Sequence, residues 1–235
     1  MSQLILGFGN KARHGKDSCA EAIIDYYQRQ HEAASKHGLI KHRAVKVQRL
    51  AFADALYKEV NEFLAITQSF DYSFQELFRM GVREVRGGEI CVDKIPDWVT
   101  PDKPLIDPRA PLGKFPKLLQ WWGTEFRRAQ NPNYWVEAWK KAIDPKADVV
   151  IVTDVRFVNE AEAIKAASGV TIKVSRLNLD GTPFVDPTRD ANHRSEIELD
   201  DYNFDYRITV KTGDLILLES WAITLVNHLK ALQGK

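Results

Sequence analysis

Residues 4–18, LILGFGNKARHGKDS, run from a short apolar segment through a glycine-containing polar turn into the start of a helical pattern. The apolar segment has the length and composition of a buried strand, and Ala20, Ile23 and Tyr27 continue beyond the turn at helical spacing. A turn between a strand and a helix can hold phosphate, because its backbone N–H groups and the positive end of the helix dipole both favour an anion. The stretch therefore predicts an α/β fold with an anion-binding turn near the N-terminus.

The turn approximates the phosphate-loop motif G-x-x-x-x-G-K-[ST], with Gly15 and Lys16 in the expected places. Asn10 stands where the motif has its first glycine, a mild departure because Asn tolerates left-handed backbone angles. Asp17 replaces the metal-binding hydroxyl, with Ser18 one place later, and a carboxylate beside phosphates is repulsive unless Mg²⁺ lies between them. We expect Lys16 to reach the β- and γ-phosphates of a nucleotide and Asp17 to contact Mg²⁺. The expected nucleotide-binding residues are Lys11, Ala12, Arg13, His14, Gly15, Lys16, Asp17 and Ser18.

A second motif overlaps the first. Gly7, Gly9 and Ala12 satisfy the loose dinucleotide fingerprint G-x-G-x-x-G/A, which needs an acidic residue about 20 positions further along the chain. The acidic residue that follows the next expected strand is Asp54, which lies much too far along. Phosphate-loop binding therefore explains the turn better than dinucleotide binding, and a tight turn without a ligand is the remaining alternative.

Strand and helix patterns alternate over most of the chain. We expect strands at residues 4–8, 45–50, 148–153, 170–175 and 207–210, and helices from about residue 15 and at 53–65, 159–167 and 215–232. Residues 148–153 form a continuous apolar run, which is typical of a parallel strand covered on both faces. The alternation predicts a three-layer α/β sandwich with a parallel central sheet, built as a single domain over residues 1–235.

One segment does not follow the alternation. Six of the ten prolines fall between Pro96 and Pro116, so this stretch is expected to be irregular. Loops of such length in compact domains are usually functional or mobile. We therefore expect residues 67–118 to form an insertion in the domain.

A second acidic residue follows the apolar strand at 148–153. Asp154 is placed at the carboxyl end of that strand, beside the ligand crevice of an open α/β sheet, where it can hold Mg²⁺. The alternative is that Asp154 caps the next helix. Arg156 would then point at phosphate oxygens, or pair with Asp154.

The amino-acid composition limits the classes of protein to which the chain can belong. The chain has 235 residues, of which 44% are hydrophobic and 28% charged, and a net charge of +1, so it is globular and lacks the basic excess of a general nucleic-acid binder. Cys19 and Cys91 form no close pair, which favours a reducing compartment. The N-terminus lacks the pattern of a signal peptide, and the apolar runs are too short to cross a bilayer. We expect a cytoplasmic protein without membrane or stable nucleic-acid binding.

Segments distributed through most of the chain resemble the bacteriophage deoxynucleoside monophosphate kinases, which have the phosphate-loop kinase fold. The matching residues are Lys11 to Ser18, Phe52-Ala53-Asp54 with Leu56 and Lys58, Leu119-Gln120 with Gly123-Thr124-Glu125 and Arg128, Asp154-Val155-Arg156-Phe157 with Asn159-Glu160-Ala161, and His193 with Ser195-Glu196. The loop also resembles that of animal-type phosphomevalonate kinase, whereas the combination with the Asp-Val-Arg-Phe and His-x-Ser-Glu segments is more specific.

The resemblance implies a nucleoside monophosphate kinase-like P-loop domain that transfers the γ-phosphoryl group of ATP, with Mg²⁺, to a deoxynucleoside 5′-monophosphate (dNMP) in the cytoplasm, that of the host if the protein is phage-encoded. The alternatives are a kinase for another phosphorylated small molecule and a non-enzymatic nucleotide-binding module. Under the kinase interpretation, the catalytic residues are Lys16, Arg156, Arg189 and Arg194, and the metal ligands are Asp17 and Asp154. The residues expected to bind the dNMP are Asp54, Gln120, Arg127, Arg128, Asp154 and Arg156.

Two further segments bear on this interpretation. Residues 177–195 form a loop with Gly181, Pro183 and Pro187 that would suit a lid over the phosphates. Ser195 and Glu196 are expected to fix the end of this loop or to cap a helix, and the acidic run of Glu196, Glu198, Asp200 and Asp201 is expected to be a solvated face. Trp121 and Trp122 lie on an expected helix with Gln120 and Arg128, and either could stack on a base or belong to the core. The proline-rich segment and the six Trp residues leave room for a homodimer.

Overall fold

The computed structural model describes residues 3–36, 43–187 and 191–233. The chain forms two compact units, and each is described by itself: the first comprises Met1–Phe52 and Trp139–Lys235, and the second Ala53–Ala138. The insertion expected at residues 67–118 lies within the second unit, which also contains the flanking helices.

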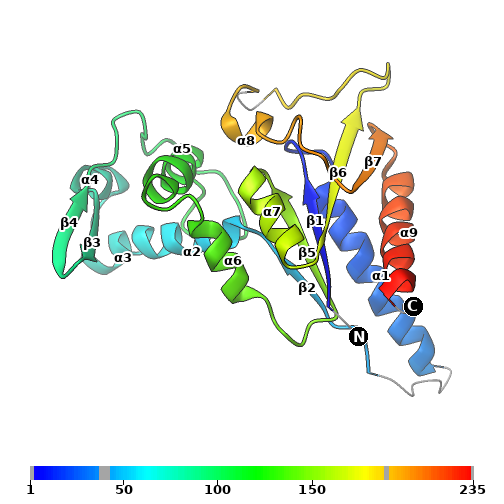
Figure 1. Cartoon of the computed structure of the whole chain (residues 1–235). Coiled ribbons are helices and arrows are strands. Elements are labelled where there is room, and N and C mark those ends of the chain that lie inside the picture. The colour runs from blue at the N-terminus through cyan, green and yellow to red at the C-terminus, as the bar shows by residue number, and fades with distance from the viewer. Residues whose placement is uncertain (1–2, 37–42, 188–190, 234–235) are drawn as a thin grey trace. The chain divides into compact units, whose positions relative to one another are not determined.

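The first unit is built on a five-stranded, wholly parallel sheet (Figure 1). Its order is β2-β5-β1-β6-β7, and the strands are β1 (Leu4–Gly9), β2 (Val47–Leu50), β5 (Val149–Val155), β6 (Val170–Leu177) and β7 (Tyr206–Lys211). All five coincide with the strands predicted from the sequence to within a few residues, so the α/β class and the parallel sheet are confirmed. The apolar run at 148–153 becomes β5, in which all residues but Asp154 are buried.

Helices cover both faces of this sheet. The helices α1 (Lys16–Lys36) and α9 (Leu215–Gln233) pack against each other on one face, and α7 (Val158–Ala166) contacts β1 and β6 on the other (Figure 1). The core between the sheet and the α1/α9 pair is continuous, and includes Phe8, Ile23 and Val226, which are fully buried. Among the described helices, α9 is the one that is long and apolar enough to span a membrane, but Leu218, Ala222, Val226 and Leu229 bury one of its faces in this core.

The second unit is mainly helical. It contains α2 (Ala53–Leu64), α3 (Ile66–Phe70), α4 (Phe74–Met80), the antiparallel hairpin β3 (Val82–Arg86) and β4 (Glu89–Asp93), and α5 (Pro116–Gln120), which continues into a π-helix, η1 (Trp121–Arg128). The helix α6 (Tyr134–Ala142) begins here and ends in the first unit. As expected for the proline-rich stretch, residues 96–115 contain no helix or strand beyond the bridge between Leu105 and Lys114.

Candidate nucleotide-binding site

The turn after β1 is shaped by an unusual series of backbone angles. Asn10, Arg13 and Gly15 have φ angles of 108°, 56° and 95°, in the region that side chains other than glycine rarely adopt. A Cβ atom on Gly15 would also lie 2.5 Å from Cδ2 of Leu218 on α9, so another residue there would displace this side chain in addition to adopting an unfavourable φ angle. Asn10 replaces the first glycine of the motif. Its unfavourable φ angle is offset because its side-chain amide donates a 2.8 Å hydrogen bond to the carbonyl of Val174 on β6.

Lys16 crosses this turn. Its Nζ donates to the carbonyl oxygens of Asn10 at 3.1 Å and of Lys11 at 2.5 Å, and the side chain is 5% exposed. Burial, and after it the neighbouring Arg156 charge, lower the pKa of Lys16 to about 7, while the carboxylates of Asp17, Glu196 and Asp154 act in the opposite direction. A buried ammonium with partners that leave part of its donor capacity unused is suited to bind a phosphate oxygen.

His14 stabilises the same turn from the other side. It is buried, and its Nδ1 accepts a 3.1 Å hydrogen bond from the backbone N–H of Arg176 at the end of β6. Burial, and after it the Lys16 charge, lower the pKa of His14 to about 4. His14 is therefore neutral at pH 7, and its hydrogen bond joins the turn to the sheet. It was predicted to bind the nucleotide, and its contacts here stabilise the conformation of the turn.

The two acidic residues predicted to contact a metal ion lie at the carboxyl ends of the strands. Asp17 is exposed in the first turn of α1 and pairs with Arg49, whose Nη2 lies 2.6 Å from its Oδ1. Asp154 is half-buried and accepts a 2.8 Å hydrogen bond from the backbone N–H of Phe52. The cap of α7 is Phe157, so the alternative that Asp154 caps this helix is wrong.

This donor set fits Mg²⁺ rather than a metal held by protein groups alone. No cluster of three or more His, Cys, Asp or Glu side chains suited to a metal ion is found among the residues that the structure describes. Mg²⁺ is commonly bound through one or two carboxylates together with phosphate oxygens and water. Asp17 and Asp154 both act on the pKa of Lys16, which places both carboxylates in the electrostatic neighbourhood of the loop.

Arg156 and Glu196 form an ion pair against the loop. Val155 at the end of β5 pairs in register with Gly9, so Arg156 emerges directly beside the turn. Its Nη1 lies 2.7 Å from Oε1 of Glu196, and the other carboxylate oxygen accepts a 3.0 Å hydrogen bond from the backbone N–H of Ala12. The expectation that this part of the acidic run is a solvated face is therefore wrong for Glu196, which is 8% exposed.

Other basic candidates of the first unit are also paired with carboxylates from the segment after β6. Lys11 pairs with Asp200, Arg13 with Asp186, and Arg194 with Glu198. Arg189, predicted to be catalytic, lies outside the described residues. Within the segment 177–195, which was expected to form a lid, the Asp186 carboxylate contacts the loop through Arg13.

In the second unit, two adjacent arginines have different environments. Arg127 is buried, and its guanidinium contacts Glu59 at 2.7 Å and Glu84 at 2.5 Å. Arg128 is half-buried and lies 3.4 Å from the carbonyl of Pro132. Gln120 is exposed. Of the residues predicted to bind the dNMP in this unit, Arg127 is already engaged by two carboxylates, whereas Gln120 and Arg128 offer polar groups near the surface.

The two tryptophans beside Gln120 both belong to the core. Trp121 is 5% exposed and stacks on Phe126, with ring centroids 5.1 Å apart. Trp122 is 3% exposed and donates from its indole nitrogen to Glu59 at 2.9 Å. Of the two alternatives that the sequence left open, the structure supports packing in the core.

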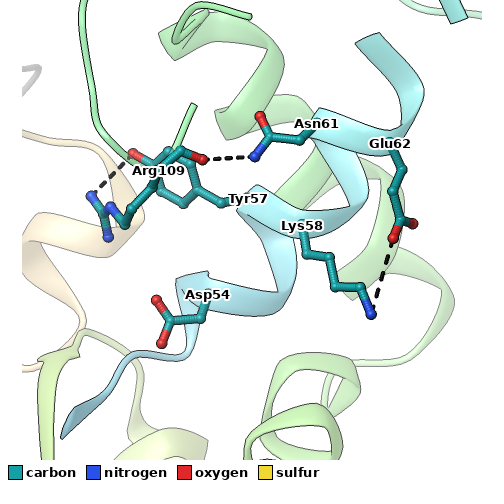
Figure 2. Close-up of a pocket in the computed structure, with 6 residues that line it drawn as sticks. All are labelled: Asp54, Tyr57, Lys58, Asn61, Glu62 and Arg109. Carbon is teal, nitrogen blue, oxygen red and sulfur yellow. Dashed lines mark hydrogen bonds and ion pairs between the residues drawn. The ribbon is translucent and has the colours of Figure 1, made fainter. Parts of the chain in front are cut away.

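Asp54, also predicted to bind the dNMP, lines a pocket of about 360 Å³ in the second unit (Figure 2). The pocket carries the side chains of Lys58 and Arg109, and the Arg109 guanidinium lies 4.1 Å from the centre of the Tyr57 ring. Lys58 pairs with Glu62 on the next turn of α2. The lining of the pocket thus combines two acidic and two basic side chains with the amide of Asn61 and the ring of Tyr57.

Comparison with known proteins gives no assignment: no protein-family model matches the chain, and no curated protein matches its sequence. The site therefore depends on its own geometry. Arg49 is a functional candidate that the sequence analysis did not identify, and Glu196 was expected to fix the end of the 177–195 loop or cap a helix rather than to contact the loop after β1. The Ser195-Glu196 segment was visible in the sequence, but its burial against the loop depends on long-range packing that no local pattern encodes.

Proposed function

We propose that the protein is a kinase that transfers the γ-phosphoryl group of ATP to a deoxynucleoside 5′-monophosphate. The observation that carries the proposal is the position of Lys16, a buried ammonium that crosses the turn between β1 and α1 and has Arg156 close by. Backbone N–H groups at a helix N-terminus, a lysine and an arginine are the groups that phosphoryl transfer requires.

The reaction needs positioning and charge neutralisation more than it needs a base. A phosphate monoester has a second pKa of about 6 and is largely dianionic at pH 7, so its oxygen attacks the γ-phosphorus without prior deprotonation. The new P–O bond forms as the bond between the γ-phosphorus and the bridging oxygen breaks, and ADP leaves with the electron pair. In this proposal Lys16 and Arg156 stabilise the charge on the γ-phosphoryl oxygens, and neutral His14 is not asked to accept a proton.

Asp17 and Asp154 would hold Mg²⁺, which neutralises charge on the β- and γ-phosphates when it is bound. Arg13 and Lys11 are placed on the loop itself, where phosphate oxygens can compete with Asp186 and Asp200 for their charges. On the acceptor side the proposal assigns Gln120 to the base and Arg128 to the monophosphate, with Asp54 at the sugar-phosphate end. Arg127 has a structural role in this scheme because Glu59 and Glu84 already bind it.

A coupled assay for ADP with a panel of acceptors tests the proposal. The panel contains the four dNMPs, the four ribonucleoside monophosphates and phosphomevalonate, each with and without Mg²⁺. We expect ADP formation that requires both Mg²⁺ and a dNMP, with the dNDP as second product. ATP hydrolysis at the same rate without any acceptor contradicts the proposal. If phosphomevalonate is the one acceptor that supports turnover, the protein is a kinase for a phosphorylated small molecule other than a dNMP.

A binding measurement separates the kinase from a nucleic-acid-associated module. Such a module predicts salt-sensitive DNA binding that survives loss of Lys16, because its phosphate contacts would be distributed over many basic residues. The kinase predicts no stable DNA binding at about 150 mM salt and loss of nucleotide affinity in the same variant.

A further inference from the structure

Glu196 occupies an anion site at the mouth of the loop. One of its carboxylate oxygens accepts from the backbone N–H of Ala12 at 3.0 Å, and the other lies 2.7 Å from the guanidinium of Arg156. The side chain is 8% exposed. A loop N–H and an arginine are donors that a phosphoryl oxygen would also use, so a protein carboxylate fills a position suited to a phosphate.

The carboxylate is delivered by an anchored turn. It belongs to the short helix α8 (Arg194–Ile197), which begins after His193, whose Nδ1 lies 2.9 Å from the Ser195 hydroxyl and 3.3 Å from its N–H. The residue after this helix, Glu198, accepts from the backbone N–H of Val158 at 3.0 Å, which ties the turn to the start of α7. Glu196 is therefore directed at the loop by contacts on both sides of it.

The charges around the loop give this arrangement a physical reason. Lys16 and Arg156 are close enough for Arg156 to lower the Lys16 pKa, and two buried cations repel each other unless an anion lies between or beside them. Glu196 acts on the Lys16 pKa in the opposite direction. A phosphate group can replace the carboxylate without leaving either cation uncompensated, because one anion is exchanged for another.

We propose that Glu196 is an internal competitor for the phosphate site: its carboxylate holds the Ala12 N–H and Arg156 until a phosphate ligand takes these two donors from it. The inference rests on the part of the proposed function that assigns phosphate binding to the loop, and it is independent of the acceptor.

The test uses inorganic pyrophosphate without metal as the probe, measured by titration calorimetry on the full chain. Glu196→Gln keeps an oxygen that can accept from the Ala12 N–H, but it removes the negative charge that pairs with Arg156. If the carboxylate occupies the site nine-tenths of the time, its removal lowers the dissociation constant for pyrophosphate about tenfold. Glu32→Gln, a matched loss of one negative charge at an exposed position in the second half of α1, is expected to leave the affinity within about twofold of wild type.

Affinity that is unchanged or weaker in Glu196→Gln overturns the inference, as does an equal gain in Glu32→Gln. Should Glu196→Gln fail to fold, Glu196→Asp retains the charge on a side chain one methylene shorter, which cannot span both donors and is expected to tighten pyrophosphate binding as well. NMR of the wild-type protein adds a second readout, because pyrophosphate must shift the Ala12 amide resonance. An Ala12 resonance that does not move at saturation also overturns the inference.

These outcomes separate the inference from the proposed function. If the wild-type protein phosphorylates dNMPs but Glu196→Gln has unchanged pyrophosphate affinity, the competitor role of Glu196 is rejected and the proposed kinase function is retained. If Glu196→Gln binds pyrophosphate more tightly but the wild-type protein forms no dNDP, the assignment of a dNMP as acceptor is rejected and the competitor role of Glu196 is retained.

Discussion

Arg49 on β2 donates a 2.6 Å hydrogen bond to Asp17 in the first turn of α1, so the acidic residue that follows the loop lysine already has a cationic partner. Both side chains are substantially exposed, 43% for Arg49 and 66% for Asp17, and an exposed ion pair of this kind contributes about 0–1 kcal/mol. The pair is therefore weak enough for a divalent cation to replace the arginine at the carboxylate.

The first prediction concerns this carboxylate. Asp17→Asn removes a negative ligand, and we expect the Mg²⁺ concentration for half-maximal activity to rise about tenfold or more, while nucleotide binding without metal stays within about twofold. Arg49→Ala is the control, because it frees the carboxylate and should leave the Mg²⁺ requirement unchanged or lower it. A superimposable Mg²⁺ titration for Asp17→Asn would assign Asp17 to the ion pair alone.

The second prediction concerns Lys16. Lys16→Met removes the buried ammonium, and we expect turnover to fall by about 100-fold or more, as for loss of a main transition-state donor. Stability should not fall with it, because burial already disfavours the charged form and lowers the Lys16 pKa to about 7. Activity and urea denaturation are measured together, with Lys36→Met at the exposed end of α1 as the control. Full turnover in Lys16→Met would remove the loop from the mechanism.

The third prediction is a pH dependence of stability that comes from His14. Its pKa is about 4 in the folded protein, against an ordinary value of 6.5 for a free histidine, so the unfolded chain takes up the proton first as the pH falls. The free energy of unfolding should decrease between pH 6.5 and 4 by an amount on the order of 3 kcal/mol from this group, and change little from it below pH 4. His14→Gln should flatten this part of the profile, whereas exposed His228→Gln should not. Parallel profiles for wild type and His14→Gln contradict the assignment.

The fourth prediction distinguishes two neighbouring arginines. Arg127→Met leaves Glu59 and Glu84 without their buried partner and should destabilise the second unit by about 3–5 kcal/mol, detected by the fluorescence of Trp121 and Trp122 during urea unfolding. Arg128→Met should fold normally and raise the KM for the dNMP about tenfold or more, with the KM for ATP little changed. The reverse pattern would exchange the two roles.

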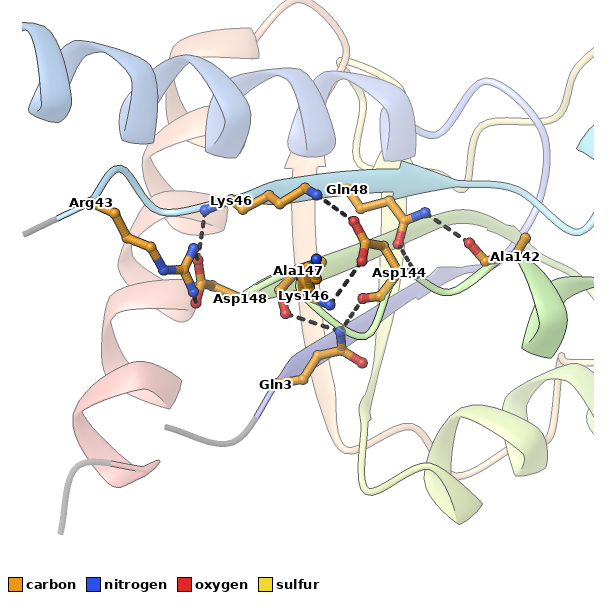
Figure 3. Close-up of polar contacts among 9 residues, drawn as sticks. All are labelled: Gln3, Arg43, Lys46, Gln48, Ala142, Asp144, Lys146, Ala147 and Asp148. Atoms are coloured by element: carbon orange, nitrogen blue, oxygen red, sulfur yellow. Dashed lines mark hydrogen bonds and ion pairs between the residues drawn. The ribbon is translucent and has the colours of Figure 1, made fainter.

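The fifth prediction concerns the amino-terminal end of β5, at the end of the sheet opposite the loop, where Asp148 immediately precedes the strand (Figure 3). Arg43 donates two hydrogen bonds to its carboxylate, at 2.7 and 2.8 Å, and the backbone N–H of Lys46 a third at 2.7 Å. Burial alone would raise the pKa of Asp148, but these donors outweigh it and hold the pKa below its usual range. Stability from this group is therefore present above the pKa of the unfolded chain and is lost as the pH falls through the lower folded value.

We expect Asp148→Asn to lower the free energy of unfolding at pH 7 by about 1–2 kcal/mol, with a smaller difference from wild type at about pH 2.5. Asp25→Asn, on the exposed face of α1, serves as the control and should change stability by less than about 0.5 kcal/mol. An equal effect of the two substitutions would show that the bonds to Arg43 and Lys46 contribute nothing measurable.

The fold of the first unit was predictable because its sequence is locally consistent. The apolar run of β5 and the alternation at β2 and β7 each have one interpretation, and helices of regular period lie between them. The second unit was less predictable. Its hairpin turns at Gly87-Gly88, a recognisable sequence, but the outward residues Val85 and Ile90 are apolar and exposed, so the strands lack the usual contrast between faces.

The candidate site divides in the same way. The loop and Asp154 were located from strand ends, because a parallel sheet brings the carboxyl ends of its strands to one edge. The contact of Glu196 with the loop could not be predicted, since it depends on the packing of α8 against residues more than a hundred positions earlier in the chain. The sequence analysis assigned both Arg127 and Arg128 to the dNMP, whereas in the π-helix Trp121–Arg128 the first is buried and the second is half-buried.

The central place of β1 has a consequence for biosynthesis. This strand leaves the ribosome well before its two neighbours, which begin only at Val149 and Val170. At typical translation rates the nascent chain carries an apolar strand with both edges open for on the order of 10 s. The loop after β1 therefore gains its neighbouring strands late in synthesis, and we expect a truncated product that stops before Val149 to expose β1 as a template for aggregation.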